Sequence, residues 1–304
     1  MKEAPGPSPG QAPNERSTAP AEVGYRLNRR ARSIRPGMHA GTETGGGLEP
    51  LVRTTLLDGR DPRRLDLLAS SRDPLRRLLV RRYRQRASVR VYVLADLSAS
   101  LGFRGRGDRI KTLASLVSAL GFSAGRAGDA FAFIGCDVRV RREFLLPPTR
   151  MSGAYLDLAD RLRDYIPRGQ GSDGLLEAIP LIGNRRALVF LVSDFHFPLA
   201  LLESVLAGVA RHQVVPVVLE DSHEAEPSPR VGLVRVLDPE TGEERTLLMR
   251  PSLRRRLRAQ AEQRKAAVFD CLAAHGAPPL VLTDHFDVDR VNRYFSPQRH
   301  VAAH

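Results

Sequence analysis

The sequence predicts an α/β protein with a doubly wound, mostly parallel sheet, preceded by an irregular N-terminal arm. From Val89 onward, short β-forming segments alternate with helical segments, which is typical of a parallel sheet covered by helices on both faces. Two strand segments, Ala187–Phe195 and Gln213–Glu220, are almost continuously apolar, as expected of strands buried on both faces. The chain has 304 residues and is 42% hydrophobic, so it can also bury a substantial core.

The elements follow from the spacing of apolar residues, because continuous or alternating runs favour strands and a stripe at helical spacing favours helices. The expected strands are Val89–Leu94, Ala130–Ile134, Val138–Leu145, Ala187–Phe195, Gln213–Glu220 and Pro278–Asp284. The expected helices are Asp108–Ala124, Ser152–Tyr165, Asp173–Ile182, Pro198–Arg211 and Ser252–His275. The turn-forming run "DPETGEE" between Val231–Leu237 and Arg245–Leu248 indicates a hairpin.

Composition divides the chain into four parts. Residues 1–22, rich in Pro, Gly, Ser and Ala, are expected to be a disordered tail. Residues 23–86 form an Arg-rich arm without clear periodicity, residues 87–295 the α/β domain, and residues 296–304 a flexible tail. No apolar run approaches the roughly 18–20 residues that span a bilayer, and no secretory signal is recognisable. The two cysteines, Cys136 and Cys271, are expected to be buried thiols of a cytoplasmic protein.

The net charge of +13 is concentrated in the arm. Residues 25–90 hold 17 Arg, no Lys and six acidic residues, a balance of +11. Such a region could hold nucleic acid, an acidic protein surface or anionic lipid. A general preference for Arg over Lys, which occur 44 and 3 times in the whole chain, explains the same excess without a partner. Charge alone therefore leaves the role of the arm open.

The segment "DLSAS" places oxygen-bearing side chains at alternate positions where the first strand of the domain ends. Residues i, i+2 and i+4 of an extended segment point the same way, so Asp96, Ser98 and Ser100 can converge on one point. Ser172 in the loop "GQGSDG" and Asp194 at the end of the most apolar strand can meet them, because the carboxyl ends of parallel strands share one edge. Carboxylate and hydroxyl oxygens suit Mg²⁺ or Mn²⁺. These five residues are therefore the predicted metal site.

Other interpretations fit parts of the same pattern. Asp and Ser are also ordinary cap and turn residues. Asp96, Ser98 and His196 could suggest a hydrolase triad, but the Gly-x-Ser-x-Gly elbow is missing and His196 is expected to be a solvent-facing loop residue. A phosphatase that uses the strand-end Asp96 as its nucleophile would need a second acidic residue two positions on, where this chain has Ser98. The run Gly102–Asp108 is not followed by the Gly-Lys-Ser/Thr of a phosphate loop, so a flexible rim is expected there. We expect no catalytic residue.

Taken together, the five predicted ligands resemble the metal-ion-dependent adhesion site (MIDAS) of the von Willebrand factor A domain. That pattern is Asp-x-Ser-x-Ser after the first strand, a Thr from a Gly-rich loop, and an Asp after the fourth strand. Ser172 stands where the family usually has Thr, which keeps the hydroxyl and loses the methyl group. The resemblance covers roughly Arg86 to Asp284 and implies a von Willebrand factor A-like domain of Rossmann-type topology.

The arm resembles the signature of the bacterial DUF58 family, approximately Gly-x-His, a Gly-rich stretch, Gly-Asp-Asp-x-Arg-x-Ile-Asp-Trp and a Ser-Ala-Arg-like close. The residues that fall on it in order are Gly37, His39, Gly45, Gly47, Glu49, Asp61, Arg64, Asp66, Ser71 and Arg72. Leu67 replaces the usual Trp, and Arg60 replaces the first Asp of the pair. Many members carry transmembrane helices, and none is expected here. The resemblance implies a gene beside a MoxR-type AAA+ ATPase, and one subgroup, MxaS-like, accompanies methanol-dehydrogenase maturation genes.

The expected function is a non-catalytic, chaperone-like module that uses bound Mg²⁺ or Mn²⁺ to grip a partner protein. An acidic residue of the partner would complete the metal site. The resemblance implies that this partner is a MoxR-type AAA+ ATPase and that the pair matures a client protein. The rival hypothesis is a nucleic-acid-binding or metal-dependent phosphodiester-cleaving protein whose arm follows phosphates. Because nucleases usually cluster several carboxylates around two ions, two Asp and three Ser disfavour nucleic acid as the partner.

Overall fold

The structure is a computed structural model of the chain. It describes residues 21–25, 36–45, 49–56, 63, 65–103, 105–224, 232–237 and 244–296, and the side chains of most of these. The predicted tails therefore lie almost wholly outside the described residues. No described helix is long and apolar enough to cross a membrane.

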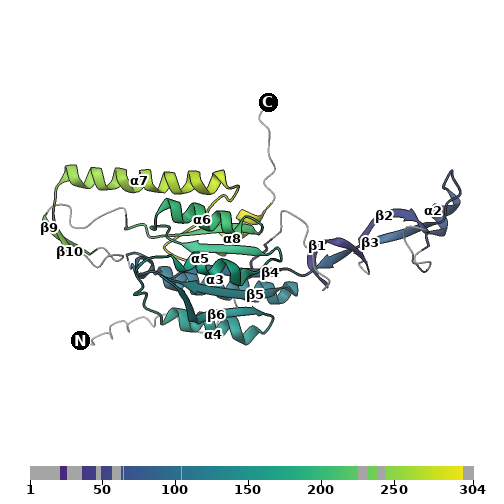
Figure 1. The fold of residues 1–304 in the computed structure, drawn as a ribbon, viewed down its shortest axis with the longest axis horizontal. Coiled ribbons are helices and arrows are strands. Elements are labelled where there is room, and N and C mark those ends of the chain that lie inside the picture. The colour runs from purple at the N-terminus through teal and green to yellow at the C-terminus, as the bar shows by residue number, and fades with distance from the viewer. Residues whose placement is uncertain are drawn as a thin grey trace, which may run out of the picture.

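A six-stranded sheet forms the centre of the α/β domain, in the order β11–β8–β7–β4–β5–β6 (Figure 1). Its strands are β4 (Arg90–Asp96), β5 (Ala130–Cys136), β6 (Val140–Thr149), β7 (Leu188–Ser193), β8 (Gln213–Glu220) and β11 (Leu280–Thr283). The first five in the spatial order are parallel, and β6 pairs antiparallel with β5. The chain leaves β4 toward β5 on one side and later returns to β7 on the other, so the strand order reverses beside β4. Loops at such a reversal form the usual ligand site of open α/β sheets.

Helices cover both faces of this sheet, as predicted. One face packs against α3 (Arg109–Ala127), α4 (Ser152–Arg163) and α8 (Val288–Phe295). The other packs against α5 (Gly174–Ile182), α6 (Leu199–Val209) and the C-terminal part of α7 (Pro251–Ala274). Successive residues of β4 alternate between the two cores: Val91 and Val93 enter one, and Tyr92 and Leu94 the other. The buried hydrophobic area on both faces is what stabilises the sheet.

The N-terminal arm contains regular structure that the sequence did not predict. Strands β1 (Pro36–Gly45), β2 (Glu49–Thr55) and β3 (Leu79–Ala87) form an antiparallel sheet in the order β1–β3–β2, with the short helix α2 (Leu67–Ser71) before β3. The prediction of an irregular arm was wrong. Arginine and glycine obscured the apolar alternation, and β1 and β2 pair with β3 across long sequence separations that local patterns do not reveal.

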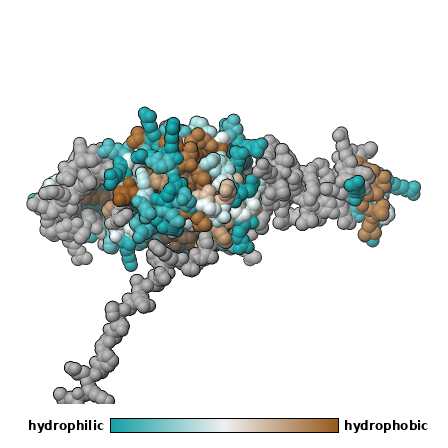
Figure 2. Space-filling view, turned by 90° about the horizontal axis from the view of Figure 1, so that it is seen from below, coloured by the Kyte–Doolittle hydropathy of each residue, from teal (hydrophilic) through white to brown (hydrophobic). Residues whose placement is uncertain are grey.

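The arm is attached at the amino ends of the parallel strands of the α/β domain, because only two residues separate β3 of the arm from β4 of the central sheet. It extends away from the rest of the molecule (Figure 1). Figure 2 shows a hydrophobic patch at its far end, where Leu67, Leu68, Leu75 and Leu78 are exposed.

Residues 21–25, which the sequence placed in the tail and the arm, pack on the α/β domain. Val23 and Tyr25 are buried in the same core as α3. The Val23 N–H donates to Ser123 Oγ over 2.8 Å, and the Tyr25 hydroxyl donates to Asp129 Oδ2 over 2.6 Å. Strands β9 (Gly232–Leu237) and β10 (Glu244–Met249) pair antiparallel, as predicted for a hairpin.

Candidate metal centre at the carboxyl edge of the sheet

Every parallel strand of the central sheet ends at, or directly before, an aspartate. These residues are Asp96, Asp137, Asp194, Asp221 and Asp284, after β4, β5, β7, β8 and β11. All but Asp284 are buried. Burying a carboxylate costs free energy unless it is paired or hydrogen-bonded. The partners of each aspartate therefore indicate which one the fold itself satisfies.

Among the buried aspartates at this edge, Asp96 has the fewest N–H and cationic partners. It is 1% exposed and accepts the Ser98 N–H at 3.0 Å and the hydroxyls of Ser172 and Ser193, each at 2.9 Å. No Arg, Lys or His of the described residues pairs with it. Burial, and then the nearby charge of Asp194, raise the pKa of Asp96 to about 7. A carboxylate disfavoured in this way is one that a cation would stabilise.

The Ser172 loop is fastened to the Asp96 loop through the backbone. Ser98 forms a parallel bridge with Gly169, and the Ala99 N–H donates to the Gly169 carbonyl over 2.7 Å. Only glycine fits at 169, because a Cβ there would lie 2.1 Å from Asp137 Oδ2. Beyond Ser98, the chain forms the 3-10 helix η2 (Ala99–Gly102), which places Ser100 Oγ 3.1 Å from Ser98 Oγ. Three serines from two loops thus lie around Asp96: Ser172 bonds its carboxylate, and Ser98 and Ser100 contact each other beside it.

Asp194 lies beside this cluster but is already paired with cations. Its Oδ2 accepts from Arg109 Nη1 at 3.2 Å, and His196 Nδ1 lies 3.2 Å from the same oxygen. Burial acts to raise the pKa of Asp194, but the hydrogen bonds and charge of His196 and the charge of Arg109 outweigh it, so this pKa lies below its usual value. The hydrogen bond with Asp194 raises the pKa of His196. Asp194 is therefore ionised without a metal.

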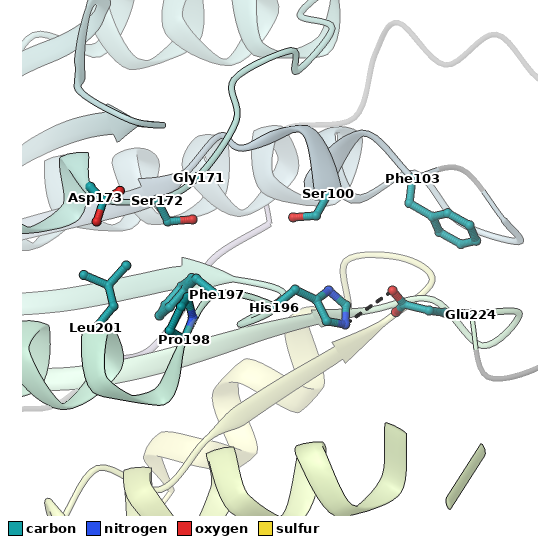
Figure 3. Close-up of a pocket in the computed structure, with 10 residues that line it drawn as sticks. All are labelled: Ser100, Phe103, Gly171, Ser172, Asp173, His196, Phe197, Pro198, Leu201 and Glu224. Atoms are coloured by element: carbon teal, nitrogen blue, oxygen red, sulfur yellow. Dashed lines mark ion pairs between the residues drawn. The ribbon is translucent and has the colours of Figure 1, made fainter. Parts of the chain in front are cut away.

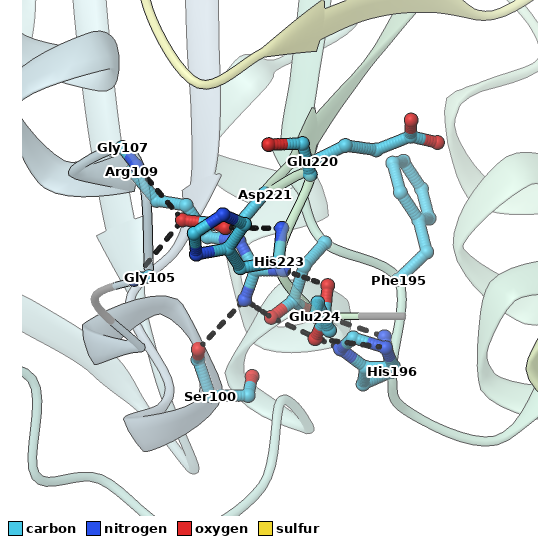
Figure 4. A network of polar contacts seen from close by, with 12 residues as sticks. Ser100, Gly105, Gly107, Arg109, Phe195, His196, Glu220, Asp221, His223 and Glu224 are labelled. Carbon is cyan, nitrogen blue, oxygen red and sulfur yellow. Dashed lines mark hydrogen bonds and ion pairs between the residues drawn. The ribbon is translucent and has the colours of Figure 1, made fainter. Parts of the chain in front are cut away.

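Arg109 connects the loops of the site, and the sequence did not predict this role. From the first residue of α3, its guanidinium also donates to the Ser100 carbonyl over 3.1 Å and pairs with Glu224 (Figure 4). The other missed residue is Ser193, whose only sequence signal was its place directly before Asp194. His196 was predicted to face solvent; its side chain is 43% exposed, but it pairs with Asp194 and lies 3.6 Å from Glu224.

The run Gly102–Asp108 was predicted to be a flexible rim, but part of it is fastened to Asp221. The N–H groups of Gly105, Arg106 and Gly107 donate to this carboxylate over 2.9–3.1 Å. His223 adds a fourth N–H at 2.8 Å. Burial acts to raise the pKa of Asp221, but these N–H groups outweigh it and hold the pKa below its usual value. Asp221 is thus satisfied by the backbone.

The donor set fits a hard divalent cation. Asp96 and the neighbouring Ser98, Ser100 and Ser172 offer one carboxylate and three hydroxyls, and the charge of Asp194 is close enough to affect Asp96. Oxygen donors of this kind suit Mg²⁺ or Mn²⁺. No group of three or more His, Cys, Asp and Glu side chains placed to hold a metal occurs among the described residues. Any metal here must therefore rely on hydroxyl ligands.

Comparison with known proteins identifies relatives over most of the chain. Residues 56–267 match the family described as "Protein of unknown function DUF58". An uncharacterized protein in the moxR 3′ region of Paracoccus denitrificans is 41% identical over 95 residues, which cover 31% of this chain and 90% of that protein. An uncharacterized protein of Mycobacterium tuberculosis (strain ATCC 25618 / H37Rv) is 26% identical over 277 residues, which cover 86% of this chain and 83% of that protein.

Solved structures with similarity to this chain share little sequence with it. The conserved hypothetical protein BatB from Bacteroides thetaiotaomicron has a TM-score of 0.45 and 13% identity, over 68% of this chain and 96% of that one. Proximal thread matrix protein 1 from the mussel byssus, in a form with a zinc-occupied MIDAS motif, has a TM-score of 0.35 and 14% identity, over 68% of this chain and 46% of that one.

Proposed function

The chain belongs to the DUF58 family, and from this premise and the geometry of the site we propose that it is a non-catalytic, metal-dependent protein-interaction module. The single observation that carries the proposal is the environment of Asp96. A carboxylate that is 1% exposed has only hydroxyls and one N–H as partners among the described residues. Its neighbours at the same edge, by contrast, have guanidinium or several backbone partners. A cation is the partner that Asp96 lacks.

The residues of the candidate metal centre would have different roles. Asp96, Ser98, Ser100 and Ser172 would hold the ion. Asp194, held by Arg109 and His196, would complete the site directly or through water and contribute negative charge. When bound, Mg²⁺ or Mn²⁺ would supply an electrophilic position that accepts a carboxylate of the partner protein. Because Asp96 is the one carboxylate among the four residues that would hold the ion, little ligand charge would oppose the incoming acid.

We propose a MoxR-type AAA+ ATPase as the partner, with the pair maturing or assembling another enzyme or complex in a chaperone-like role. The name of the Paracoccus denitrificans relative, which places it in a moxR 3′ region, supports this choice. An MxaS-like role in methanol-dehydrogenase maturation stays a narrower form of the same proposal.

Co-purification with the MoxR-type ATPase of the same genome tests this function. We expect capture in Mg²⁺ and at least about tenfold less in EDTA. Ser172→Ala should weaken capture in Mg²⁺ to a similar degree, because it removes a metal ligand. A matched control is Ser204→Ala, since Ser204 is an exposed serine on α6 whose hydroxyl bonds only to its own helix. Thermal melting should show that both variants fold as the wild type does.

Two outcomes would contradict the proposal. Capture that is equal in Mg²⁺ and EDTA would remove the metal from the mechanism. Capture by Ser172→Ala that matches that of Ser204→Ala would show that the loop hydroxyl has no part in it.

A further inference from the structure

A cleft of about 610 Å³ opens beside the serine cluster, between two walls of different chemistry. Ser100 and Ser172 lie on one wall, and their hydroxyls point toward one another (Figure 3). The facing wall is formed by the chain from His196 to Leu201. The candidate metal centre therefore opens into a space that is larger than a single carboxylate requires.

The facing wall is largely apolar. Phe197 is buried, Pro198 is exposed and Leu201 is half-buried, and all three line the cleft. Phe103 lies at the opposite end, beside Ser100, and is 42% exposed (Figure 3). Apolar surface that lines a concave site and remains in contact with solvent is typical of a binding surface.

The charges around the cleft restrict what can bind there. Asp194 is offset by Arg109 and His196, and Glu224 also pairs with Arg109. The exposed Asp173, next to Ser172, also lines the cleft, but Asp96 is the buried carboxylate at the serine cluster that has no cationic partner among the described residues. A divalent cation bound to Asp96 would place a positive charge at that point. A carboxylate is attracted to that point, and a positively charged group is repelled. The apolar wall favours a partner that also carries an apolar side chain close to its carboxylate.

We propose that the cleft binds a partner segment in which an acidic side chain lies next to a bulky apolar residue, such as Leu or Phe. The acidic group meets the metal centre between Ser100 and Ser172, and the apolar side chain packs against the wall around Leu201. This inference rests on the proposed metal-dependent function and adds the side chain that must accompany the acid. A partner that offered only a carboxylate would leave the apolar wall exposed to water.

Short capped peptides test the two requirements separately. We would titrate the full chain with N-acetyl-Asp-amide, N-acetyl-Asp-Leu-amide, N-acetyl-Leu-Asp-amide and N-acetyl-Asn-Leu-amide, in Mg²⁺ and in EDTA, and follow binding by NMR. In Mg²⁺, at least one of the two Leu-containing acidic peptides should bind about fivefold tighter than N-acetyl-Asp-amide, because part of its leucine is buried. The Asn peptide should not bind, and EDTA should abolish binding of all of them.

In Leu201→Ser, the Leu-containing acidic peptide should bind no more tightly than N-acetyl-Asp-amide, so the affinity ratio should fall from about five to about one. The affinity for N-acetyl-Asp-amide itself should not change. Leu181→Ser is the matched control, since Leu181 is 48% exposed on α5 and does not line the cleft. Leu201→Ala, which removes most of the same apolar surface, is the second variant if Leu201→Ser does not fold.

The outcomes separate this inference from the proposed function. Equal affinity for all three acidic peptides in wild type would overturn the apolar requirement and leave the metal-dependent function standing. A preference for leucine that persists in EDTA and does not need the acid would overturn the metal-dependent function. No binding of any acidic peptide in Mg²⁺ would overturn both.

Discussion

Asp96 and Asp221 lie at the same edge of one sheet and are both buried, yet the fold satisfies them in different ways. Asp221 accepts four backbone N–H groups, and Asp96 accepts one N–H and two serine hydroxyls. A backbone N–H can only donate, whereas a hydroxyl both donates and accepts. The hydroxyls around Asp96 can therefore turn their lone pairs to a cation. The comparison distinguishes a carboxylate that fastens a loop from one that is available to a ligand.

The largest expected effect concerns the stability that Asp221 provides. Asp221→Ala leaves four N–H groups without their acceptor and should lower the free energy of unfolding by about 3 kcal/mol. Urea denaturation in EDTA measures this. Asp284→Asn, at the end of the neighbouring strand, is the control and should cost less than about 1 kcal/mol, because Asp284 accepts a single N–H from Ser222 and Asn tolerates its φ of 63°. Equal losses in the two variants would contradict the structural role of Asp221.

Asp96→Asn should change the free energy of unfolding in the opposite direction and raise it. Burial and the charge of Asp194 raise the pKa of Asp96 to about 7, which means that the metal-free fold disfavours the ionised side chain. Replacing it by a neutral amide should therefore stabilise the protein at pH 8 in EDTA, by about 2 kcal/mol. The same denaturation experiment measures the change. A loss as large as that of Asp221→Ala would show that Asp96 is an ordinary structural acceptor.

The fold of the α/β domain could be predicted because its signals are local. The apolar runs at β7 and β8 and the amphipathic spacing of α3 each identify an element without reference to any other. The three-stranded sheet of the arm had no such signal, because β3 carries arginine at positions where apolar alternation would be expected. The helix α8 was missed because it is short, with Val291 as its buried residue.

The candidate site could be predicted in part. Asp96, Ser98 and Ser100 followed from one stretch of sequence, and the shared edge of parallel strands added Ser172 and Asp194. Arg109 could not be found in this way, because its role depends on the direction in which a long side chain leaves α3. The pairing of Asp194 with Arg109 and His196 is likewise a tertiary property. It means that the two aspartates, which looked equivalent in the sequence, differ in their availability to a metal.

The smallest expected effect is the pH dependence that Asp221 contributes. Its folded-state pKa is below that of the unfolded chain, so the stability it provides is present above about pH 4 and is lost as pH falls through the lower folded-state pKa. Thermal melting between about pH 5 and 2.5 should show a shallower loss for Asp221→Asn than for wild type. An unchanged slope in Asp221→Asn would show that the N–H groups do not favour the charged form.

Calorimetric titration of the full chain with Mg²⁺ and with Mn²⁺ would show whether Asp96 holds a metal ion. We expect one ion per chain for wild type and for Asp284→Asn, and no measurable binding for Asp96→Asn, which removes the buried carboxylate of the serine cluster. Binding by Asp96→Asn with the wild-type stoichiometry and affinity would contradict the account, because the ion would then be held elsewhere.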